Sequence, residues 1–298
     1  MLTRVTVIGC GLIGGSIVKR LRETQAAAHL SVIDAESVLS RSAALVDAVA
    51  VSGSREALAL VQNSDLVVLA TPVRAIIASL PGVLASMAPH AVVTDTGSSK
   101  RAVLDAAANS PACRRFVAGH PMAGREIGGY DASDPALFLS ARWFLVTSGL
   151  GPESAPDLDA LARVEELVRV LGAEPQPCDA DSHDRAMAYV SHVPQLISSA
   201  VHGAAARAGV VDRAGPGFRD VTRIAGGPSS MWRDIFDTNR QYIAEALGEL
   251  LRPLLELQGE LQRGEPAATE RALALLEEAQ LTKAEAQASI KPKAPAVS

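Results

Sequence analysis

Short apolar runs alternate with segments of helical periodicity over the first 178 residues. Runs such as 5–8 and 64–72 are mainly apolar without alternating polar positions, which is typical of parallel strands covered on both faces. The segments between them repeat apolar residues every three to four positions, as amphipathic helices do. This order predicts a doubly wound α/β domain over 1–178. Further strands are expected at 30–34, 50–51, 91–95, 116–119, 142–147 and 174–178, and helices at 38–49, 75–87 and 156–171.

The pattern changes at Asp179, where strand-like alternation stops and long amphipathic segments begin. We expect an all-α domain over 179–288, followed by a disordered Pro/Lys-rich tail over 289–298. A helical domain with this many apolar faces commonly buries some of them against a second copy, so a homodimer is expected. The predicted helices are 184–207 with a break or kink near Pro194, 231–262 running through Pro253, and 267–287, with a Gly/Pro-rich loop at 209–217.

A glycine pattern joins the first strand to the first helix. Gly9, Gly11 and Gly14 have the spacing of a dinucleotide-binding loop, which also contains Leu12 and Ile13. The three glycines serve a tight turn, a close approach of the backbone to pyrophosphate, and the packing of helix on strand. The helix that follows offers unpaired N–H groups and a positive dipole end to phosphates. Together these features predict a Rossmann-type nucleotide site.

An acidic residue, Asp34, ends the second strand about twenty positions after Gly14. A carboxylate there accepts hydrogen bonds from the ribose hydroxyls of NAD and repels the 2′-phosphate of NADP. The residues that directly follow include no arginine for such a phosphate. The predicted cofactor is therefore NAD. Thr71 and Pro72 end another strand at the edge where open α/β sheets bind ligands, and we expect them to line the cofactor site.

Two more strand ends deliver Ser98 and His120 to the same edge. Beside a nicotinamide, these side chains suit hydride abstraction from a carbon that carries a hydroxyl group. His120 is the candidate proton acceptor, because the ordinary pKa of histidine lies near neutral pH, and Ser98 is its candidate orienting partner. For Lys100 two interpretations stay open, a catalytic lysine or a non-catalytic residue that pairs with Asp95 or faces solvent. We favour the second.

Arginines gather in the helical domain after the Gly/Pro-rich loop. Arg219 and Arg223 lie close in sequence to Trp232. Arginine forks suit bidentate carboxylate binding, so these arginines are candidate substrate ligands. His192 lies on a mostly apolar helix, which favours a packed or hydrogen-bonded core histidine. The remaining histidines, His183 among them, show no partner pattern, and no role is predicted for them.

The composition argues against several functions. With 28 Lys+Arg against 33 Asp+Glu the net charge is −5, so no basic footprint for nucleic acid or an anionic membrane surface is present. The 3 cysteines form no CxxC pair, and neither a disulfide framework nor a metal site is expected. No apolar run is long enough to span a bilayer, and the N-terminus leads directly into a strand, so no signal peptide is expected. The predicted location is the cytoplasm.

Taken in order, the motifs form a recognisable combination. They are VIGCGLIGGS, LATPV, TDTGSSK, GHPMAGRE, SHVPQ and FRDVTRIAGGPSSMWRDIF. This set, spread over about 5–261, resembles the prephenate/arogenate dehydrogenases of tyrosine biosynthesis. The resemblance implies a Rossmann domain followed by a helical dimerisation domain. It also implies oxidation of prephenate or arogenate at C4 by NAD(P)+ with release of CO2, driven by formation of an aromatic ring.

The resemblance implies roles for individual residues. His120 matches the catalytic histidine that bonds the 4-hydroxyl of the substrate, and Ser98 matches its orienting partner. Ser191 matches a serine near the nicotinamide and the substrate. Arg223 matches the arginine that holds the ring carboxylate, which agrees with the separate expectation that arginines bind the two carboxylates of the substrate.

Other matched positions bear on the dimer and on substrate choice. Arg219 and Trp232 match positions contributed across the dimer interface, which implies a composite active site. Gln195 stands where some members carry a histidine linked to substrate or tyrosine recognition. Arg125 is a candidate for the side-chain carboxylate. Glu126 is a candidate partner of Arg125 or of the ammonium group of arogenate.

The main interpretation is an NAD-dependent prephenate dehydrogenase, and several alternatives stay open. Within the family these are arogenate dehydrogenase and a dehydrogenase of secondary metabolism that acts on an amino-substituted prephenate. A β-hydroxyacid or imine reductase shares the same layout, but it needs a catalytic lysine in the helical domain, and 184–199 contains none. A regulator that binds NAD without turnover is the most distant alternative.

Overall fold

A computed structural model gives the structure of the chain, and the residues that it describes are 2–125, 127–148, 155–227 and 229–289. The chain divides into two compact units, one ending at Ile243 and the other starting at Ala244. The change from strands to helices falls at Asp179, as the sequence predicts. The division into domains after residue 178 stays a prediction. The expected disordered tail lies, apart from its first residue, outside the described part of the chain.

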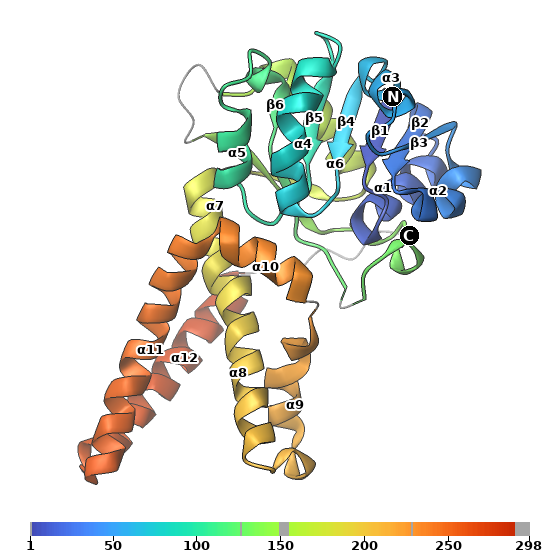
Figure 1. Cartoon of the computed structure of the whole chain (residues 1–298). Helices are drawn as coiled ribbons and strands as arrows, with labels where there is room; N and C mark the ends of the chain where they lie inside the picture. Colours follow the sequence, from blue (N-terminus) through green and yellow to red (C-terminus); the bar gives the residue numbers. More distant parts are fainter. Residues whose placement is uncertain (1, 126, 149–154, 228, 290–298) are drawn as a thin grey trace. The chain divides into compact units, whose positions relative to one another are not determined.

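Six parallel strands form the main sheet, in the order β3-β2-β1-β4-β5-β6 (Figure 1). The chain runs outward from β1 to β3 and then crosses back to β4, so that β1 and β4 lie side by side. Ligands of open α/β sheets bind at the carboxyl ends of strands where the strand order reverses in this way. The strands are β1 (Leu2–Ile8), β2 (Ala27–Asp34), β3 (Ala48–Val51), β4 (Leu66–Leu69), β5 (Val92–Asp95) and β6 (Phe116–Val117).

Alternate residues of the central strands contribute to two separate cores. Val7 and Val68 belong to the core that includes α1 and α6. Val67 and Leu69 belong to the core that includes α3, α4 and α5. Both faces of the sheet are therefore covered, which explains the continuous apolar runs and confirms the predicted doubly wound domain. The helices are α1 (Leu12–Glu23), α2 (Glu36–Ser42), α3 (Arg55–Gln62), α4 (Val73–Ser86), α5 (Arg101–Ala107) and α6 (Leu158–Val170).

A second sheet of three strands follows, in the order β7-β8-β9. The prediction that strands at 142–147 and 174–178 continue the doubly wound sheet is wrong, because β8 pairs with β7 and β9 instead. The parallel ladder ends after β6, and the N–H of Gly119 donates to the side-chain carboxylate of Asp95 at 3.0 Å. The strands are β7 (Gly119–Pro121), β8 (Arg142–Ser148) and β9 (Glu174–Asp179).

The helices that follow β9 differ from the prediction at two places. The expected irregularity near Pro194 is a π-helical turn just before it, η4 (Ala188–His192). The helix predicted over 231–262 is two helices, which are separated at Asn239. The side chain of Asn239 bonds to the carbonyl oxygen of Asp184 and to His192. The elements are α7 (Ala180–Met187), α8 (Val193–Arg207), α9 (Pro216–Thr222), η6 (Arg223–Gly226), α10 (Ser229–Thr238), α11 (Arg240–Arg263) and α12 (Ala267–Ser289).

The second compact unit contains α11 from Ala244 onward and the whole of α12. α11 continues through Pro253, as the sequence predicts. Arg271 of α12 donates to Glu260 at 2.8 Å and to Glu256 at 2.9 Å, so ion pairs join the two helices. Several leucines of this unit are more than half exposed in the single chain, namely Leu255, Leu261, Leu276 and Leu281.

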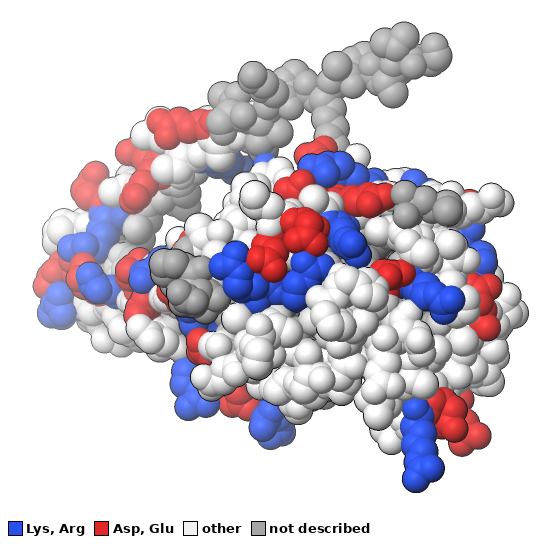
Figure 2. Space-filling view, turned by 90° about the horizontal axis from the view of Figure 1, so that it is seen from above, with Lys and Arg blue, Asp and Glu red and all other residues white. Residues whose placement is uncertain are grey.

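Charges of both signs are interspersed on the face shown in Figure 2, where basic and acidic side chains alternate. Among the described residues, charges of opposite sign also form ion pairs, for example Arg114 with Asp157 and Arg115 with Asp159. No helix in the described ranges is long and apolar enough to cross a membrane.

Candidate active site

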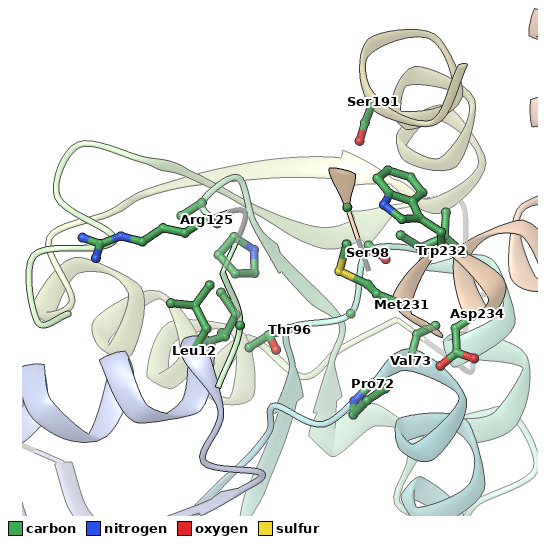
Figure 3. Close-up of a pocket in the computed structure, with 18 of the residues that line it drawn as sticks. Leu12, Pro72, Val73, Thr96, Ser98, Arg125, Ser191, Met231, Trp232 and Asp234 are labelled. Carbon is green, nitrogen blue, oxygen red and sulfur yellow. The ribbon is translucent and has the colours of Figure 1, made fainter. Parts of the chain in front are cut away.

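A cleft of about 1570 Å³ opens at the carboxyl edge of the main sheet, within the first compact unit. It brings together segments that are distant in sequence: the glycine loop, the ends of β4 and β5, β7, η4, η6 and α10 (Figure 3). Most of the predicted site residues line it, namely Leu12, Ile13, Thr71, Pro72, Ser98, His120, Arg125, Ser191, Gln195, Arg223 and Trp232.

The glycine loop has the geometry that the sequence predicts. Gly9 has a φ of +92°, in the left-handed region that disfavours other residues. A Cβ at Gly14 would lie 1.8 Å from the carbonyl oxygen of Gly9, so only glycine allows this packing of α1 on the loop. A Cβ at Gly11 would meet nothing within 4 Å. The loop therefore surrounds an open cradle at Gly11, and no side chain among the described residues caps the start of α1, which suits a phosphate group.

Asp34 lies at the end of β2, beside this cradle. Its carboxylate accepts from the N–H groups of Cys10 at 2.5 Å and of Ala35 at 2.6 Å, which ties the end of the strand to the glycine loop. Burial, and next the charge of Asp34, raise the pKa of the Cys10 thiol to about 11, so this thiol stays protonated at neutral pH. The hydroxyl Oγ1 of Thr71 is buried with no hydrogen-bond partner in the described structure. An open cradle and an unpaired hydroxyl fit a nucleotide.

Lys100 is structural, as favoured from the sequence. Its ammonium group lies 2.5 Å from Oδ2 of Asp95 and 2.6 Å from the carbonyl oxygen of Gly119, and its side chain is 0% exposed. Asp95 also accepts from the N–H of Gly97 at 2.8 Å. The pair therefore holds the loop after β5 against β7. Ser98 follows Gly97 in this loop. The buried ion pair therefore helps to fix the position of Ser98 in the cleft.

His120 lies on β7, opposite Phe144 of β8, and lines the cleft. Its Nδ1 lies 2.9 Å from Nε2 of His183. Burial lowers the pKa of His120 well below its ordinary value, and the neighbouring His183, Lys100 and His192 lower it further. The imidazole is therefore neutral at neutral pH and has a lone pair available. Ser98 is half-buried in the same cleft, and its predicted contact with His120 stays a prediction.

Sequence reasoning missed His183 and Asp184, at the start of α7. Both are buried, with 3% and 1% of their surface exposed, and Nδ1 of His183 lies 2.8 Å from Oδ1 of Asp184. The pair reaches His120 from 63 residues further along the chain. The signal in the sequence is an adjacent His-Asp pair directly after a predicted strand, where a helix begins.

The helical part contributes one wall of the cleft. Figure 3 shows Ser191 directed from η4 toward the region of Ser98 and Trp232. The indole Nε1 of Trp232 is buried without a hydrogen-bond partner in the described structure, and its ring lies 6.2 Å from that of His192. Gln195 donates to the carbonyl oxygen of Ile224 at 2.8 Å, which ties α8 to η6.

His192 is a buried, hydrogen-bonded core histidine, as the sequence favours. Its Nδ1 lies 3.1 Å from Nδ2 of Asn239, which also donates to the carbonyl oxygen of Asp184 at 2.7 Å. Burial lowers the pKa of His192, the charge of Asp184 opposes this shift and His183 adds to it, and the resulting pKa is about 4. This histidine is therefore neutral in the folded protein near neutral pH.

The predicted roles of Arg125, for the side-chain carboxylate, and of Glu126, for Arg125 or an ammonium group, remain predictions. Arg125 lines the cleft but forms an ion pair with Asp134, and Figure 3 shows its guanidinium group directed away from Ser98 and Trp232. Glu126 lies outside the described residues.

Of the two residues expected across the dimer interface, one lines the cleft and the other does not. Trp232 lines the cleft of its own chain, and its expected contribution across the dimer interface stays a prediction. Arg219 is exposed on α9, donates to the carbonyl oxygen of Ala214 at 3.0 Å and is not among the residues that line the cleft. Arg223, on η6, is exposed and lines the cleft.

Comparison with known families agrees with this geometry. The family model for the prephenate dehydrogenase nucleotide-binding domain matches residues 17–175, and the model for the prephenate dehydrogenase dimerization domain matches residues 179–276. The chain belongs to the prephenate dehydrogenase family. The resemblance inferred from the motifs is confirmed, and so are the nucleotide-binding and helical character of its two parts.

Individual relatives extend over most of the chain. It is 30% identical over 267 residues to prephenate dehydrogenase of Bacillus subtilis, which covers 85% of this chain and 69% of the relative. A crystal structure of prephenate dehydrogenase from A. aeolicus with hydroxyphenyl propionate and NAD+ is 26% identical, with a TM-score of 0.79 over 96% of this chain and 98% of that one. Arogenate dehydrogenase of Synechocystis is 25% identical, with a TM-score of 0.74 over 95% of this chain and 100% of that one.

Proposed function

We propose that this protein is an NAD-dependent prephenate dehydrogenase, which converts prephenate to 4-hydroxyphenylpyruvate and CO2. One observation carries the proposal. Leu12 of the glycine loop, His120 and Arg223 line a single cleft. A nucleotide loop, a neutral base and a cation that suits a carboxylate are therefore available to one substrate molecule. The similarity to proteins named prephenate dehydrogenase supports the same function.

NAD is the proposed cofactor, held by the glycine loop at Gly11 and by Asp34. Its nicotinamide accepts a hydride from the substrate carbon that carries the hydroxyl group. The open cradle at Gly11 leaves room for the pyrophosphate, and the start of α1 offers it N–H groups. Asp34 is proposed to bond the ribose hydroxyls and to disfavour the 2′-phosphate of NADP.

His120 is the proposed base. Its lowered pKa leaves the imidazole neutral, so it accepts the proton of the 4-hydroxyl while the hydride leaves the same carbon. The bond between the ring and its carboxylate then breaks, CO2 leaves, and the electron pair of that bond completes the aromatic ring. The proton returns to the phenolate oxygen, so the overall reaction releases no proton. Ser98 is proposed to orient His120.

The carboxylates of the substrate are proposed to meet arginines. Arg223 binds the ring carboxylate, because a guanidinium group matches a carboxylate with two parallel hydrogen bonds. This contact holds the ring carboxylate in place while it is charged. The CO2 that forms when the bond breaks is neutral and is no longer bound by the guanidinium group. Arg125 binds the side-chain carboxylate of the substrate after its ion pair with Asp134 breaks. Ser191 and Gln195 bound the same space from η4 and α8.

We further propose that residues 1–178 bind the cofactor and that 179–288 form a homodimer with a composite site. The match to a dimerization-domain model supports the dimer. Apolar side chains that are more than half exposed, such as Val190 and Val221, support burial against a second copy. Arg219 lies outside the cleft of its own chain, which fits a residue that serves the partner's site.

The test of this function is NADH formation by the purified protein, measured with prephenate and with L-arogenate, each with NAD+ and with NADP+. The proposal predicts the highest kcat/KM for prephenate with NAD+. The likeness to an arogenate dehydrogenase makes arogenate the alternative substrate. A higher kcat/KM with arogenate assigns that activity instead, and no turnover with either substrate despite NAD+ binding refutes both.

A further inference from the structure

A buried chain of hydrogen bonds leads from His120 to the start of α7. Nδ1 of His120 lies 2.9 Å from Nε2 of His183, and Nδ1 of His183 lies 2.8 Å from Oδ1 of Asp184. Neither His183 nor Asp184 is among the residues that line the cleft. Within the described structure, His183 and Asp184 are therefore connected to the cleft through His120.

The partners of Asp184 set the direction of these hydrogen bonds. Its Oδ1 accepts from the N–H of Lys100 at 2.7 Å, and its Oδ2 accepts from the N–H of Arg101 at 2.9 Å. A carboxylate that faces donors at both oxygens also accepts from Nδ1–H of His183, which leaves Nε2 of His183 as an acceptor. His120 then donates from Nδ1–H, so its Nε2 holds the lone pair.

We propose that His183 and Asp184 are positioning residues that fix His120 in the tautomer whose Nε2 accepts a proton. This inference rests on the proposed function, since the tautomer matters for turnover only where His120 acts as a base. A neutral histidine has one donor and one acceptor nitrogen, so the other tautomer presents an N–H group to the substrate. In serine proteases, loss of the carboxylate that fixes the tautomer lowers kcat by about 10⁴-fold.

The surroundings hold this chain in place. The ring of His183 packs edge-on against Phe144 with centroids 5.5 Å apart, and Asn239 donates to the carbonyl oxygen of Asp184 at 2.7 Å. His183 and Asp184 lie in the segment that matches the dimerization-domain model, whereas His120 lies in the segment that matches the nucleotide-binding model. The helical segment therefore controls the protonation pattern of a base that the other segment carries.

The direct test is the tautomer of His120 in the wild-type protein, which needs no variant that might misfold. The chain has 6 histidines, so nitrogen-15 NMR of histidine-labelled protein resolves them, and a His120→Asn variant identifies the signals of His120. The proposal predicts a proton on Nδ1 and none on Nε2 of His120, at neutral pH. A proton on Nε2 of neutral His120 overturns it.

Kinetics of His183→Phe and Asp184→Asn provide the second test. The phenyl ring keeps the packing against Phe144 and removes both hydrogen bonds, whereas the amide keeps the shape of Asp184 and removes its charge. Both variants should lose kcat by ~10²- to 10⁴-fold with little change in the KM for prephenate or in the Kd for NAD+. His90→Phe, at an exposed surface site, is the matched control and should keep wild-type kcat.

The pH profile separates positioning from general damage. The charged or titratable groups around His120 are Lys100 with Asp95, His183 with Asp184, His192, and Arg223 across the cleft. His183 lowers the pKa of His120, so His183→Phe should move the acid limb of kcat/KM to higher pH. A folded His183→Phe protein with wild-type kcat and an unmoved acid limb overturns the proposal. The NMR test still decides the tautomer if the wild-type protein oxidises neither prephenate nor arogenate, so the two failures are distinguishable.

Discussion

The ammonium group of Lys100 lies 2.5 Å from Oδ2 of Asp95, and neither side chain is exposed to solvent. This pair is more than a buried contact, because Lys100 also reaches the carbonyl oxygen of Gly119. It joins the loop that carries Ser98 to the strand that carries His120. A buried charge pair of this kind is costly to break from one side, since the remaining charge stays in a low-dielectric interior.

Lys100→Met is therefore expected to lower the free energy of unfolding by about 3–5 kcal/mol, because it leaves the Asp95 carboxylate buried and unpaired. The measurement is denaturant unfolding. Arg74→Met is the matched control, since Arg74 pairs with Asp237 at the surface with 58% and 47% of their side chains exposed. That loss should stay below about 1 kcal/mol. Equal stability of the Lys100→Met and wild-type proteins would contradict the structural role of Lys100.

Two glycines of the nucleotide loop are expected to respond differently to alanine. At Gly14 a Cβ would lie 1.8 Å from the oxygen of Gly9, so Gly14→Ala should cost about 1–3 kcal/mol of stability or more. At Gly11 a Cβ meets nothing within 4 Å, so Gly11→Ala should fold normally and weaken NAD+ binding by about tenfold or more by filling the phosphate cradle. Thermal unfolding and calorimetric titration with NAD+ separate the two effects. Wild-type NAD+ affinity in Gly11→Ala would contradict binding of the pyrophosphate at Gly11.

Arg223→Ala is expected to raise the KM for prephenate by about 10- to 100-fold with a smaller change in kcat, because a charge-assisted hydrogen bond contributes about 1.5–3 kcal/mol. Steady-state kinetics at saturating NAD+ provide the measurement. Arg114→Ala is the control, because Arg114 pairs with Asp157 and is not among the residues lining the cleft. If both variants have the same KM as the wild type, Arg223 does not bind a carboxylate of the substrate.

Stability is expected to fall in acid because of buried histidines. The folded-state pKa of His192 is about 4, below its ordinary value of 6.5, so the unfolded chain binds a proton before the folded protein does. The free energy of unfolding should therefore fall as the pH drops from about 6.5 toward 4, by about 1.4 kcal/mol per pH unit for this group. His120 acts in the same direction.

The measurement for this prediction is urea unfolding over that pH range for wild type and His192→Gln. An amide at this position keeps a polar partner for Asn239 and does not titrate. The variant should lose about one proton's worth of the pH dependence. An identical pH dependence in the two proteins would show that His192 is not the group responsible.

The parts of the site that follow local rules were predictable from the sequence. The glycine loop is fixed by the spacing of Gly9, Gly11 and Gly14, because the strand, turn and helix that need them are contiguous. Ser98 follows the end of β5 and His120 lies on β7 shortly after the end of β6, and parallel strands bring such ends to one edge. These residues therefore meet in one cleft, as expected.

The parts that depend on distant contacts were not predictable. Apolar periodicity runs unbroken past Asn239, but the helix is interrupted at this residue, whose side chain bonds to the carbonyl oxygen of Asp184 and to His192. His183 looks like any helix histidine until the fold places its ring beside His120. The separate sheet of β7, β8 and β9 is formed by pairing between strands that lie apart in the sequence, which no local pattern indicates.

The central claim is that the cleft oxidises prephenate with His120 as its base. The most direct test is the turnover of His120→Asn beside the wild type, with saturating prephenate and NAD+, followed by NADH absorbance, with NAD+ binding measured on the same samples. We expect the wild type to form NADH, kcat of the variant to fall by about 10²- to 10⁴-fold, and NAD+ affinity to stay unchanged. Equal turnover of the two proteins would contradict it.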